Sequence, residues 1–323
     1  MKLYPMKLKP VLKDIIWGGT RLANEYKKAE PDKKIAESWE LCVHPNGANI
    51  IENGEYAGKT LEELFDADKS IISQNYNGSK FPILIKFIDA EQDLSVQVHP
   101  DNAYAAKHAG ELGKTEMWYI IDCEPGAQLV YGLNADYTRD ELEHLIKSGK
   151  FELCLNYIDV NPGDVFFIPA GLIHAIGAGI LLAEIQQNSD TTYRLYDYNR
   201  SGADGKPREL HVNQALDVCI KVKSEYKPKI IRESMIWLEA LSQCEYFSVS
   251  RLNLIKLKKS SINVPGYFAS VICLDGEGEI ICGREKYKIK KGDSYFIPAG
   301  VNNFKIVGSL DIILTTLEEQ FNE

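Results

Sequence analysis

The stretch PGDVFFIPAGLIHAIG (residues 162–177) is nearly repeated as KGDSYFIPAGVNNFKI (residues 291–306). The two stretches align without a gap, and seven of their first ten positions are identical. Each reads as a short strand entered through a Gly-Asp turn and left through Pro-Ala-Gly, because proline lacks a ladder N–H and glycine permits a tight turn. Seven identities are too many to attribute to a chance similarity between two turn-rich strands. The repeat therefore predicts two β-barrels of the same design.

The rest of the chain has the same texture, with short runs rich in Val, Ile, Phe and Tyr between Gly, Pro, Asn and Asp turns. This spacing is typical of a mainly β sandwich or barrel. Three segments predict short helices instead: 59–67, 101–113 and 138–149. The third opens with Thr138 and has Glu141 three residues later, which is the pattern of a capping box.

A polar, lysine-rich stretch, KVKSEYKPKIIRES (residues 221–234), reads as a connector before the second copy of the repeated motif. We expect a first domain over residues 1–230, carrying the short helices, and a second domain over residues 231–323. The domains differ in one chemical respect, since His174 of the first copy aligns with Asn303 of the second and no histidine follows His211. The second domain is therefore predicted to be metal-free, with Asn303 as a turn or surface residue whose amide serves the local backbone.

Composition narrows the class of protein. Of 323 residues, 45% are apolar and 26% are charged, which are ordinary values for a globular protein. No run approaches the ~18 apolar residues of a membrane span, and the N-terminus lacks the apolar core of a signal peptide, so we expect a cytoplasmic protein. Seven scattered cysteines without a CxxC pair read as buried thiols rather than a disulfide framework or zinc knuckle. A net charge of -9 argues against nucleic-acid or lipid-surface binding, so an anionic ligand would need a local basic cluster.

Polar residues gather on one predicted strand face. In LSVQVHP (residues 94–100), Ser95, Gln97 and His99 alternate with apolar residues and therefore share a face, which indicates a barrel lumen that binds something. Taken alone, a strand histidine is more often a hydrogen-bonded residue than a metal ligand, and this reading is kept for four others: His44, His108, His144 and His211.

Glu116 and His174 complete a candidate metal site, and Lys114 is expected nearby. Glu116 opens the strand after this one, with Lys114 two residues earlier on the same face, and His174 leaves the repeated corner. Two imidazoles and a carboxylate are good zinc ligands. The spacing and same-face geometry favour a single meeting point for four residues: Gln97, His99, Glu116 and His174.

Six motifs in order give a resemblance to a known family. The chain resembles the short bacterial form of the type I mannose-6-phosphate isomerases, within the cupin superfamily, from about residue 7 to about residue 218 and more weakly to near its end. The motifs are IIWGG, ESWEL, LSVQVHPDN, GKTEMWYI, GDVFFIPAGLIHAIG and EIQQNSDTTYRLYDYNR. The long helical insertion of larger members is reduced here to the segments near 101–113 and 138–149, which leaves open how the mouth of the site is closed.

The resemblance implies two cupin-like jelly-roll β-barrels and a zinc enzyme that interconverts mannose 6-phosphate and fructose 6-phosphate. It also implies one zinc per chain, with Arg194 as an active-site residue and four metal ligands: Gln97, His99, Glu116 and His174. The substrate would be a small sugar phosphate.

The reaction moves a proton between C2 and C1 of the open-chain sugar through a cis-enediol(ate). Zinc and a guanidinium could stabilise the negative oxygen that develops. Arg194 suits either that oxygen or a phosphate, although a surface salt bridge is the bland alternative. Lys114 is expected to be a second cation near the metal. There are three candidates for the base that transfers the proton: Asp190, a zinc-bound water and a transiently released ligand histidine.

Two other classes of function fit part of the pattern. Two histidines and a carboxylate on a cupin can hold Fe(II) for oxygen chemistry, although Gln97, Arg194 and Lys114 speak against this. A non-catalytic sugar-phosphate-binding cupin is the other alternative, and retention of every candidate ligand disfavours it. The oligomeric state leaves no mark in the sequence.

Overall fold

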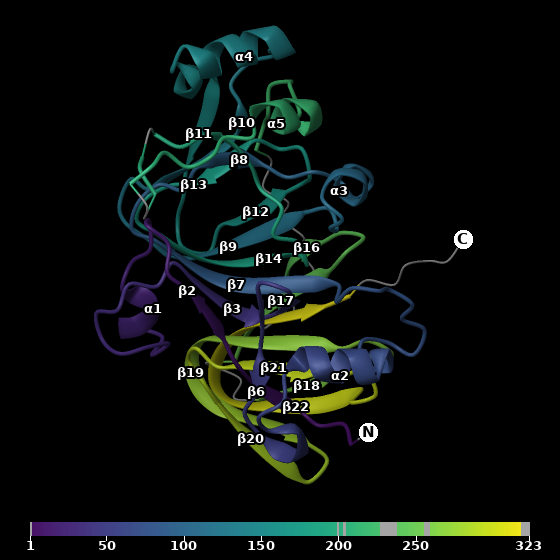
Figure 1. The fold of residues 1–323 in the computed structure, drawn as a ribbon. Coiled ribbons are helices and arrows are strands. Elements are labelled where there is room, and N and C mark those ends of the chain that lie inside the picture. The colour runs from purple at the N-terminus through teal and green to yellow at the C-terminus, as the bar shows by residue number, and fades with distance from the viewer. Residues whose placement is uncertain (1, 199, 203–204, 227–237, 255–258, 318–323) are drawn as a thin grey trace.

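The computed structural model describes residues 2–198, 200–202, 205–226, 238–254 and 259–317. The chain is mainly β, and its three large sheets lie in layers, with most of the short helices around them (Figure 1). No described helix is long and apolar enough to cross a membrane.

A six-stranded antiparallel sheet forms the middle layer. Its order is β12-β9-β14-β7-β3-β2, with bounds Val165–Ile168, Glu116–Cys123, Ile180–Gln187, Ile83–Ala90, Glu37–Leu41 and Val11–Lys13. Strands β7 and β14 are buried at every position because this sheet is covered on both faces. This explains why their sequences, ILIKFIDA and ILLAEIQQ, are almost continuously apolar and do not alternate.

A five-stranded sheet packs on one face of the middle layer. Its order is β11-β10-β13-β8-β15, with bounds Leu155–Asp159, Gln128–Leu133, His174–Ile176, Val96–Val98 and Tyr193–Tyr196. The core between the two sheets includes Trp118, Phe166 and Leu182. The outer face of the five-stranded sheet buries Val96 and Val98 beneath helices α4 (Arg139–Lys147) and α5 (Val212–Val218).

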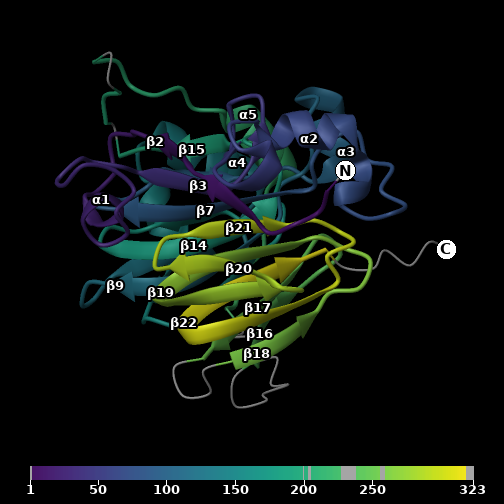
Figure 2. The same cartoon turned by 90° about the horizontal axis from the view of Figure 1, so that it is seen from below.

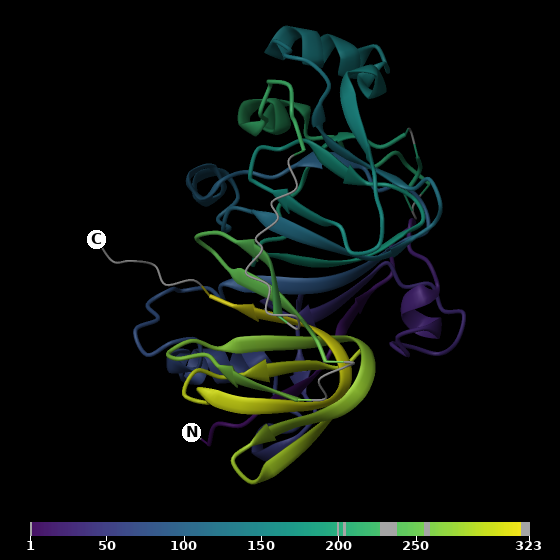
Figure 3. The same ribbon diagram turned by 180° about the vertical axis from the view of Figure 1, so that it is seen from behind.

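A nine-stranded sheet packs on the other face of the middle layer, as Figure 2 shows from below. Its path is β16-β17-β22-β19-β21-β1-β6, with β18 on β22 and β20 on β19. The bounds, in that order, are Leu238–Gln243, Ser248–Asn253, Asn303–Thr316, Ala269–Cys282, Ser294–Ile297, Met6–Lys9, Ile50–Ile51, Lys259–Asn263 and Glu285–Lys290. The 14-residue strands β19 and β22 curve strongly (Figure 3).

The N-terminus joins the C-terminal half of the chain. Leu8 of β1 pairs with Ser294 of β21 on one side and with Ile51 of β6 on the other. The predicted boundary at residue 230 falls outside the described residues. The sheet that follows this boundary therefore contains two strands from the first predicted domain as well as its own.

The repeated motif forms the same corner in both halves. Gly163 and Gly171 flank β12 with φ of 93° and 87°, and Gly292 and Gly300 flank β21 with φ of 85° and 95°. Glycine is the default residue at positive φ, which explains why both glycines of the motif are present in each copy. The aspartate after the first glycine has the same role in each copy, since Asp164 accepts from the Asn161 N–H at 2.8 Å and Asp293 accepts from the Lys290 N–H at 3.0 Å.

The described sheets keep edge strands and do not close into barrels, so two jelly-roll barrels remain a prediction. Asn303 opens β22 on the surface, opposite Asn263. The contact predicted for the Asn303 amide is made by its neighbour in the described structure: the amide oxygen of Asn302 faces the backbone N–H of Gly266 at 3.5 Å.

The three helices predicted from the sequence form, one of them shorter than expected, and two further helices, α1 (Arg21–Asn24) and α5, were not predicted. Helix α2 (Leu61–Ala67) and helix α4 both begin with a complete capping box, the latter through Thr138 and Glu141 as predicted. Helix α3 (Asn102–His108) ends earlier than the predicted segment 101–113, because the chain turns through Gly110 at φ 65° and returns Lys114 N–H to Pro100 O. The remaining short elements are β4 (Val43–His44), β5 (Gly47–Ala48) and 3-10 turns at Gly54–Tyr56, Lys69–Ile71 and Phe151–Cys154.

Candidate metal centre

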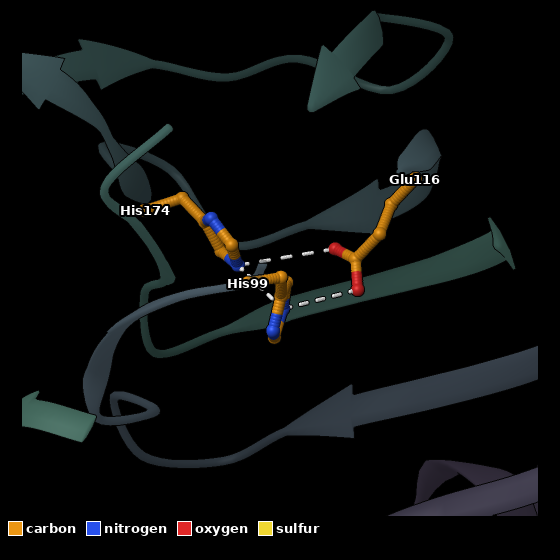
Figure 4. A group of neighbouring side chains, drawn as sticks. All are labelled: His99, Glu116 and His174. Carbon is orange, nitrogen blue, oxygen red and sulfur yellow. Dashed lines mark hydrogen bonds and ion pairs between the residues drawn. The ribbon is translucent and has the colours of Figure 1, made fainter. Parts of the chain in front are cut away.

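Three buried side chains converge between the five-stranded and six-stranded sheets (Figure 4). They are His99, Glu116 and His174, each at most 1% exposed, and their ligand atoms lie within 4.8 Å of one another. His99 Nε2 is 3.3 Å from Glu116 Oε1 and 3.1 Å from His174 Nε2, and His174 Nε2 is 3.9 Å from Glu116 Oε2. Among the described residues, this is the group of His, Cys, Asp and Glu whose spacing could hold a metal ion.

The repeated corner brings the two histidines together. His174 begins β13, directly after the Pro-Ala-Gly turn, and pairs in register with Gln97 of β8. The Gly171 N–H in that turn donates to the His99 carbonyl at 2.9 Å. Glu116 comes from the facing sheet, where it begins β9 opposite Ile168, the last residue of the repeated strand β12. One corner therefore positions all three side chains.

Each imidazole has its tautomer fixed by a backbone carbonyl. His99 Nδ1 lies 2.9 Å from Thr191 O, and His174 Nδ1 lies 2.8 Å from Leu172 O. A carbonyl oxygen only accepts, so both Nδ1 atoms carry the proton and both Nε2 atoms present lone pairs.

Two nitrogen lone pairs that face each other at 3.1 Å cannot hydrogen-bond to one another. Metal–nitrogen bonds of about 2.0–2.1 Å place tetrahedral ligand atoms about 3.3–3.4 Å apart. The observed separations of 3.1, 3.3 and 3.9 Å lie around this value. The donor set therefore fits a divalent metal ion.

Burial and neighbouring charges set the three side chains in the protonation states that metal binding requires. Burial, and then His99, lowers the pKa of His174 to about 3. Burial and the Lys114 ammonium lower the pKa of His99. Burial alone would raise the pKa of Glu116, but the positive charge of Lys114 opposes this, and the pKa lies well below its usual range. The site therefore offers two neutral imidazoles and one carboxylate near neutral pH.

Lys114 touches two of the predicted ligands. Its Nζ lies 2.6 Å from Glu116 Oε1 and 3.2 Å from His99 Nε2, and the residue is 4% exposed. An ammonium and a metal ion would compete for the same lone pairs, so metal binding would require a small displacement of this side chain.

Gln97 lies at the rim of the cluster. Its Nε2 is 3.5 Å from His174 Nε2. An amide nitrogen does not bind metals, so ligation by Gln97 requires a half-turn of the amide that brings Oε1 to this side.

Arg194 shares a row across the sheet with the cluster. Arg194 of β15 pairs with Gln97, which pairs in turn with His174. The described hydrogen bonds of its guanidinium run to neutral oxygens, from Nε to Ser95 Oγ at 3.1 Å and from an Nη atom to Glu209 O at 2.8 Å. Burial, and then the charge of Arg208, lowers the pKa of this guanidinium.

Asp190 is exposed on the segment that follows β14. Its Oδ2 accepts from Asn46 Nδ2 at 2.8 Å, and no described hydrogen bond joins it to the three clustered side chains. The next residue is Thr191, whose carbonyl orients His99, so Asp190 lies beside the cluster without contacting it.

Comparison with known proteins identifies the family. A model of the type I phosphomannose isomerase catalytic domain matches residues 6–120, and a model of the mannose-6-phosphate isomerase cupin domain matches residues 238–317. Mannose-6-phosphate isomerase ManA of Bacillus subtilis is 44% identical over 98% of this chain and 100% of its own length. The chain belongs to the type I mannose-6-phosphate isomerase family.

Other comparisons agree. The mannose-6-phosphate isomerase of Streptococcus mutans is 38% identical over 98% of this chain and 99% of its own. A crystal structure of mannose 6-phosphate isomerase from Bacillus subtilis superposes with a TM-score of 0.90 at 37% identity, covering 96% of this chain and 99% of that one. The isomerase from Salmonella typhimurium, at 18% identity and a TM-score of 0.79, shows a shared fold. The resemblance inferred from the motifs is confirmed, and the protein is an aldose–ketose isomerase.

The isomerase also contains buried charges that sequence reasoning missed. Trp118 Nε1 donates to Glu116 Oε2 at 3.2 Å and lies 3.0 Å from Glu184 Oε2. Lys86 Nζ lies 3.1 Å from Glu184 Oε1 and 3.7 Å from Glu37 Oε2. The signal was present in the sequence, since Lys86 and Glu184 interrupt the two most apolar strands, and buried charges of this kind are costly unless paired.

The pKa shifts of this network reflect its burial. Burial raises the pKa of Glu184, and the negative charge of Glu116 raises it further. Burial would lower the pKa of Lys86, but Glu184 and Glu37 raise it. Glu184, Lys86 and Glu37 extend the buried polar residues from the cluster toward β3.

Proposed function

We propose that this isomerase is zinc-dependent and interconverts mannose 6-phosphate and fructose 6-phosphate through a cis-enediol(ate). One zinc ion per chain would be held by Gln97, His99, Glu116 and His174. The observation that carries this proposal is the pair of Nε2 lone pairs facing each other at 3.1 Å beside a buried carboxylate.

Bound zinc would supply a Lewis acid that stabilises the negative oxygen of the enediolate. The chain's own residues would do the rest. Arg194 cannot lose its proton near neutral pH and presents a planar fork of donors, so it suits the enediolate oxygen. Lys114, displaced from the ligand atoms, would add a second positive charge within the same buried space.

The proton transferred between C2 and C1 needs a base, and we assign this role to Asp190. Its position in the segment that also orients His99 supports the assignment. Asp190→Asn retains the shape and the contact with Asn46 but cannot accept the proton. We expect it to lower kcat by about 10²-fold or more, and a change below about threefold would leave the base to another group.

A local basic cluster supports a phosphorylated substrate. Arg194, Arg200 and Arg208 lie close enough to influence one another, and the latter two share the carboxylate of Asp197 at 2.7 and 2.5 Å. Three guanidinium groups against the carboxylates of Asp197 and Glu209 leave a local positive charge in a chain whose net charge is -9. Positive charge of this kind would attract the phosphate of the substrate.

The finer architecture is also part of the proposal. We assign a catalytic cupin barrel to residues 1–230 and a second, metal-free cupin-like barrel to residues 231–323. The repeated corner and the cupin-domain match over residues 238–317 support this reading. A cytoplasmic location, a small sugar-phosphate substrate and no binding to nucleic acid or membrane complete the picture.

A coupled assay that measures fructose 6-phosphate formed from mannose 6-phosphate, with elemental analysis of the same sample, tests the function. We expect turnover and one zinc per chain. Turnover without zinc would overturn the metal assignment. Iron with oxygen consumption and no isomerisation would favour an Fe(II) oxygenase, for which two histidines and a carboxylate also suffice. Tight sugar-phosphate binding without turnover would indicate a non-catalytic binding protein.

A further inference from the structure

A second cavity lies outside the metal centre, on the side of the molecule where α3 projects (Figure 1). It forms where the loop at residues 73–78 meets α3 and the loops at residues 245–246 and 265–267 of the nine-stranded sheet. Its volume is about 520 Å³, within the range of roughly 300–1,000 Å³ typical of small-molecule sites. None of the proposed metal ligands lines it.

The lining of this cavity is polar and nearly uncharged. Among the described residues that line it, Glu245 is the charged one, and neither lysine, arginine nor histidine is present. A phosphorylated ligand would therefore find no counter-charge among the lining residues. Three tyrosines line the cavity together with amide side chains, which donate and accept hydrogen bonds as sugar hydroxyl groups do: Gln74, Asn75, Asn77, Asn102 and Gln187. Aromatic rings beside neutral hydrogen-bonding groups fit an uncharged polyhydroxyl compound.

Hydrogen bonds join the cavity wall to the strand that carries Glu116. Asn102 Nδ2 donates to Tyr246 Oη at 3.3 Å, and Gln187 Nε2 donates to Asn102 Oδ1 at 3.0 Å. Gln187 also makes two hydrogen bonds to Thr115. Its side-chain Oε1 accepts from the Thr115 N–H at 3.0 Å, and its backbone N–H donates to Thr115 O at 3.1 Å.

Thr115 lies between Lys114 and Glu116 at the start of β9. Lys114 and Glu116 are 2.6 Å apart in the metal centre. A ligand that orders Tyr246 and Asn102 would act through the side chains of Asn102 and Gln187. It would thereby affect the positions of Lys114 and Glu116. The contacts are contiguous; Gln187, at the end next to the metal centre, is 4% exposed, whereas Asn102 is exposed to solvent.

We propose that this cavity is a second ligand site, which binds an uncharged sugar or polyol and thereby changes turnover at the metal centre. The site is distinct from the substrate site in its chemistry, because it lacks the positive charge that a sugar phosphate requires. The ligand would stabilise the Tyr246–Asn102–Gln187 contacts, and by linkage the occupancy of each site would affect the affinity of the other.

Titration calorimetry with methyl α-D-mannopyranoside tests the binding step. This probe has no phosphate and a ring that cannot open, so it is not a substrate. We expect one saturable site in the metal-loaded wild-type protein, with a Kd in the millimolar range or tighter, and at least tenfold weaker binding in both Tyr246→Ala and Asn75→Ala. Tyr157→Ala, which removes an exposed tyrosine of β11 outside the cavity, is the matched control and should bind as the wild type does.

Three results would overturn the binding site: no saturable heat, unchanged affinity in both cavity variants, or competitive displacement of the glycoside by mannose 6-phosphate. The last would place the probe at the metal centre. Because calorimetry needs no turnover, the result is independent of the proposed isomerase mechanism.

The coupling is tested by turnover. Saturating glycoside should change kcat or KM for mannose 6-phosphate by about twofold or more in the wild type and by less in Asn102→Ala, which breaks the chain of hydrogen bonds. Circular dichroism verifies that this variant is folded. An equal effect in both proteins, or no effect in the wild type, would overturn the coupling.

Discussion

At the scale of single residues, the proposed metal centre depends on which atoms of its side chains face one another. The carbonyls of Thr191 and Leu172 use the Nδ1 protons and leave the Nε2 lone pairs of His99 and His174 facing each other. Glu116 remains ionised because the positive charge of Lys114 opposes the effect of its burial. Charge and tautomer are therefore set before a metal binds.

Glu116→Gln tests the role of that charge. The substitution retains the shape of the side chain but removes the negative charge and one anionic ligand oxygen. We expect the Zn²⁺ Kd to rise by at least about tenfold, with a parallel loss of activity at limiting zinc. Competition with a chromophoric chelator gives the affinity, and circular dichroism is the control for folding. An unchanged Kd would remove Glu116 from the metal site.

Arg194 acts either on the transition state or on substrate binding, and kinetics separates the two. If it stabilises the enediolate, Arg194→Ala lowers kcat by about 10²–10³-fold while zinc content stays normal. Steady-state kinetics with mannose 6-phosphate gives kcat and KM separately. A raised KM with kcat unchanged would instead make Arg194 a phosphate anchor.

Asp197 should give the protein an acid-sensitive contribution to stability. Burial would raise its pKa, but hydrogen bonds from Arg208 and Arg200 lower it below the ordinary value of 3.8. A depressed carboxyl pKa contributes stability that is fully present above pH 3.8 and is lost as the pH falls through the folded-state pKa.

Asp197→Asn should therefore lower the free energy of unfolding by at least about 1 kcal/mol near neutral pH. The difference from the wild type should shrink at acidic pH. Urea unfolding at several pH values measures this. A difference that stays constant down to the acid limit would contradict the assigned ion pairs.

At the scale of elements, the repeated corner has the same backbone conformation in both copies but leads to different residues. In the first copy the Gly171 N–H ties the turn to the carbonyl of His99, and the strand that follows starts with His174. In the second copy the same turn leads into β22, which starts with the exposed Asn303. The backbone is retained in both copies, whereas the first copy places His174 in the proposed metal centre.

Gly171→Ala and Gly300→Ala form a matched pair. Both glycines have positive φ, 87° and 95°, so alanine should cost each about 1 kcal/mol of stability or more. An added Cβ at position 171 would also lie 2.9 Å from the Val218 carbonyl oxygen, whereas at position 300 it would meet a flexible Leu3 methyl at 2.7 Å.

We expect Gly171→Ala to weaken zinc binding as well as stability, and Gly300→Ala to reduce stability alone. Thermal unfolding and zinc affinity measured on both variants test this. Equal zinc affinity in the two variants would show that the first corner does not position the ligands.

Local patterns made the corner and the capped helices predictable. Gly-Asp turns, Pro-Ala-Gly turns and the Thr138–Glu141 capping box are interactions over a few residues, so the sequence displays them directly. The clustering of His99, Glu116 and His174 was accessible through strand alternation together with the family motifs. Lys86 and Glu184 were missed because their pairing joins strands far apart in the chain, and each looks like an exception in an apolar run.

At the scale of the whole molecule, the six-stranded sheet carries Glu116 on one face and packs against the nine-stranded sheet with the other. Met117 and Tyr119, which alternate with Glu116 and Trp118, lie in the core shared with Phe296 and Ile313. The N-terminal strand β1 enters the nine-stranded sheet, a pairing that no local pattern predicts because its partner lies at the other end of the chain. The sheet that lacks a proposed metal site therefore supports the one that has it.

Zinc titration of metal-free protein, with turnover of mannose 6-phosphate as the readout, tests the central claim most directly. We expect turnover to be absent without metal, to rise in proportion to added zinc, and to reach a plateau at one zinc per chain. The His174→Ala variant should show little turnover over the same range. Full turnover of the metal-free protein, or a plateau reached by His174→Ala at the wild-type level, would contradict the account.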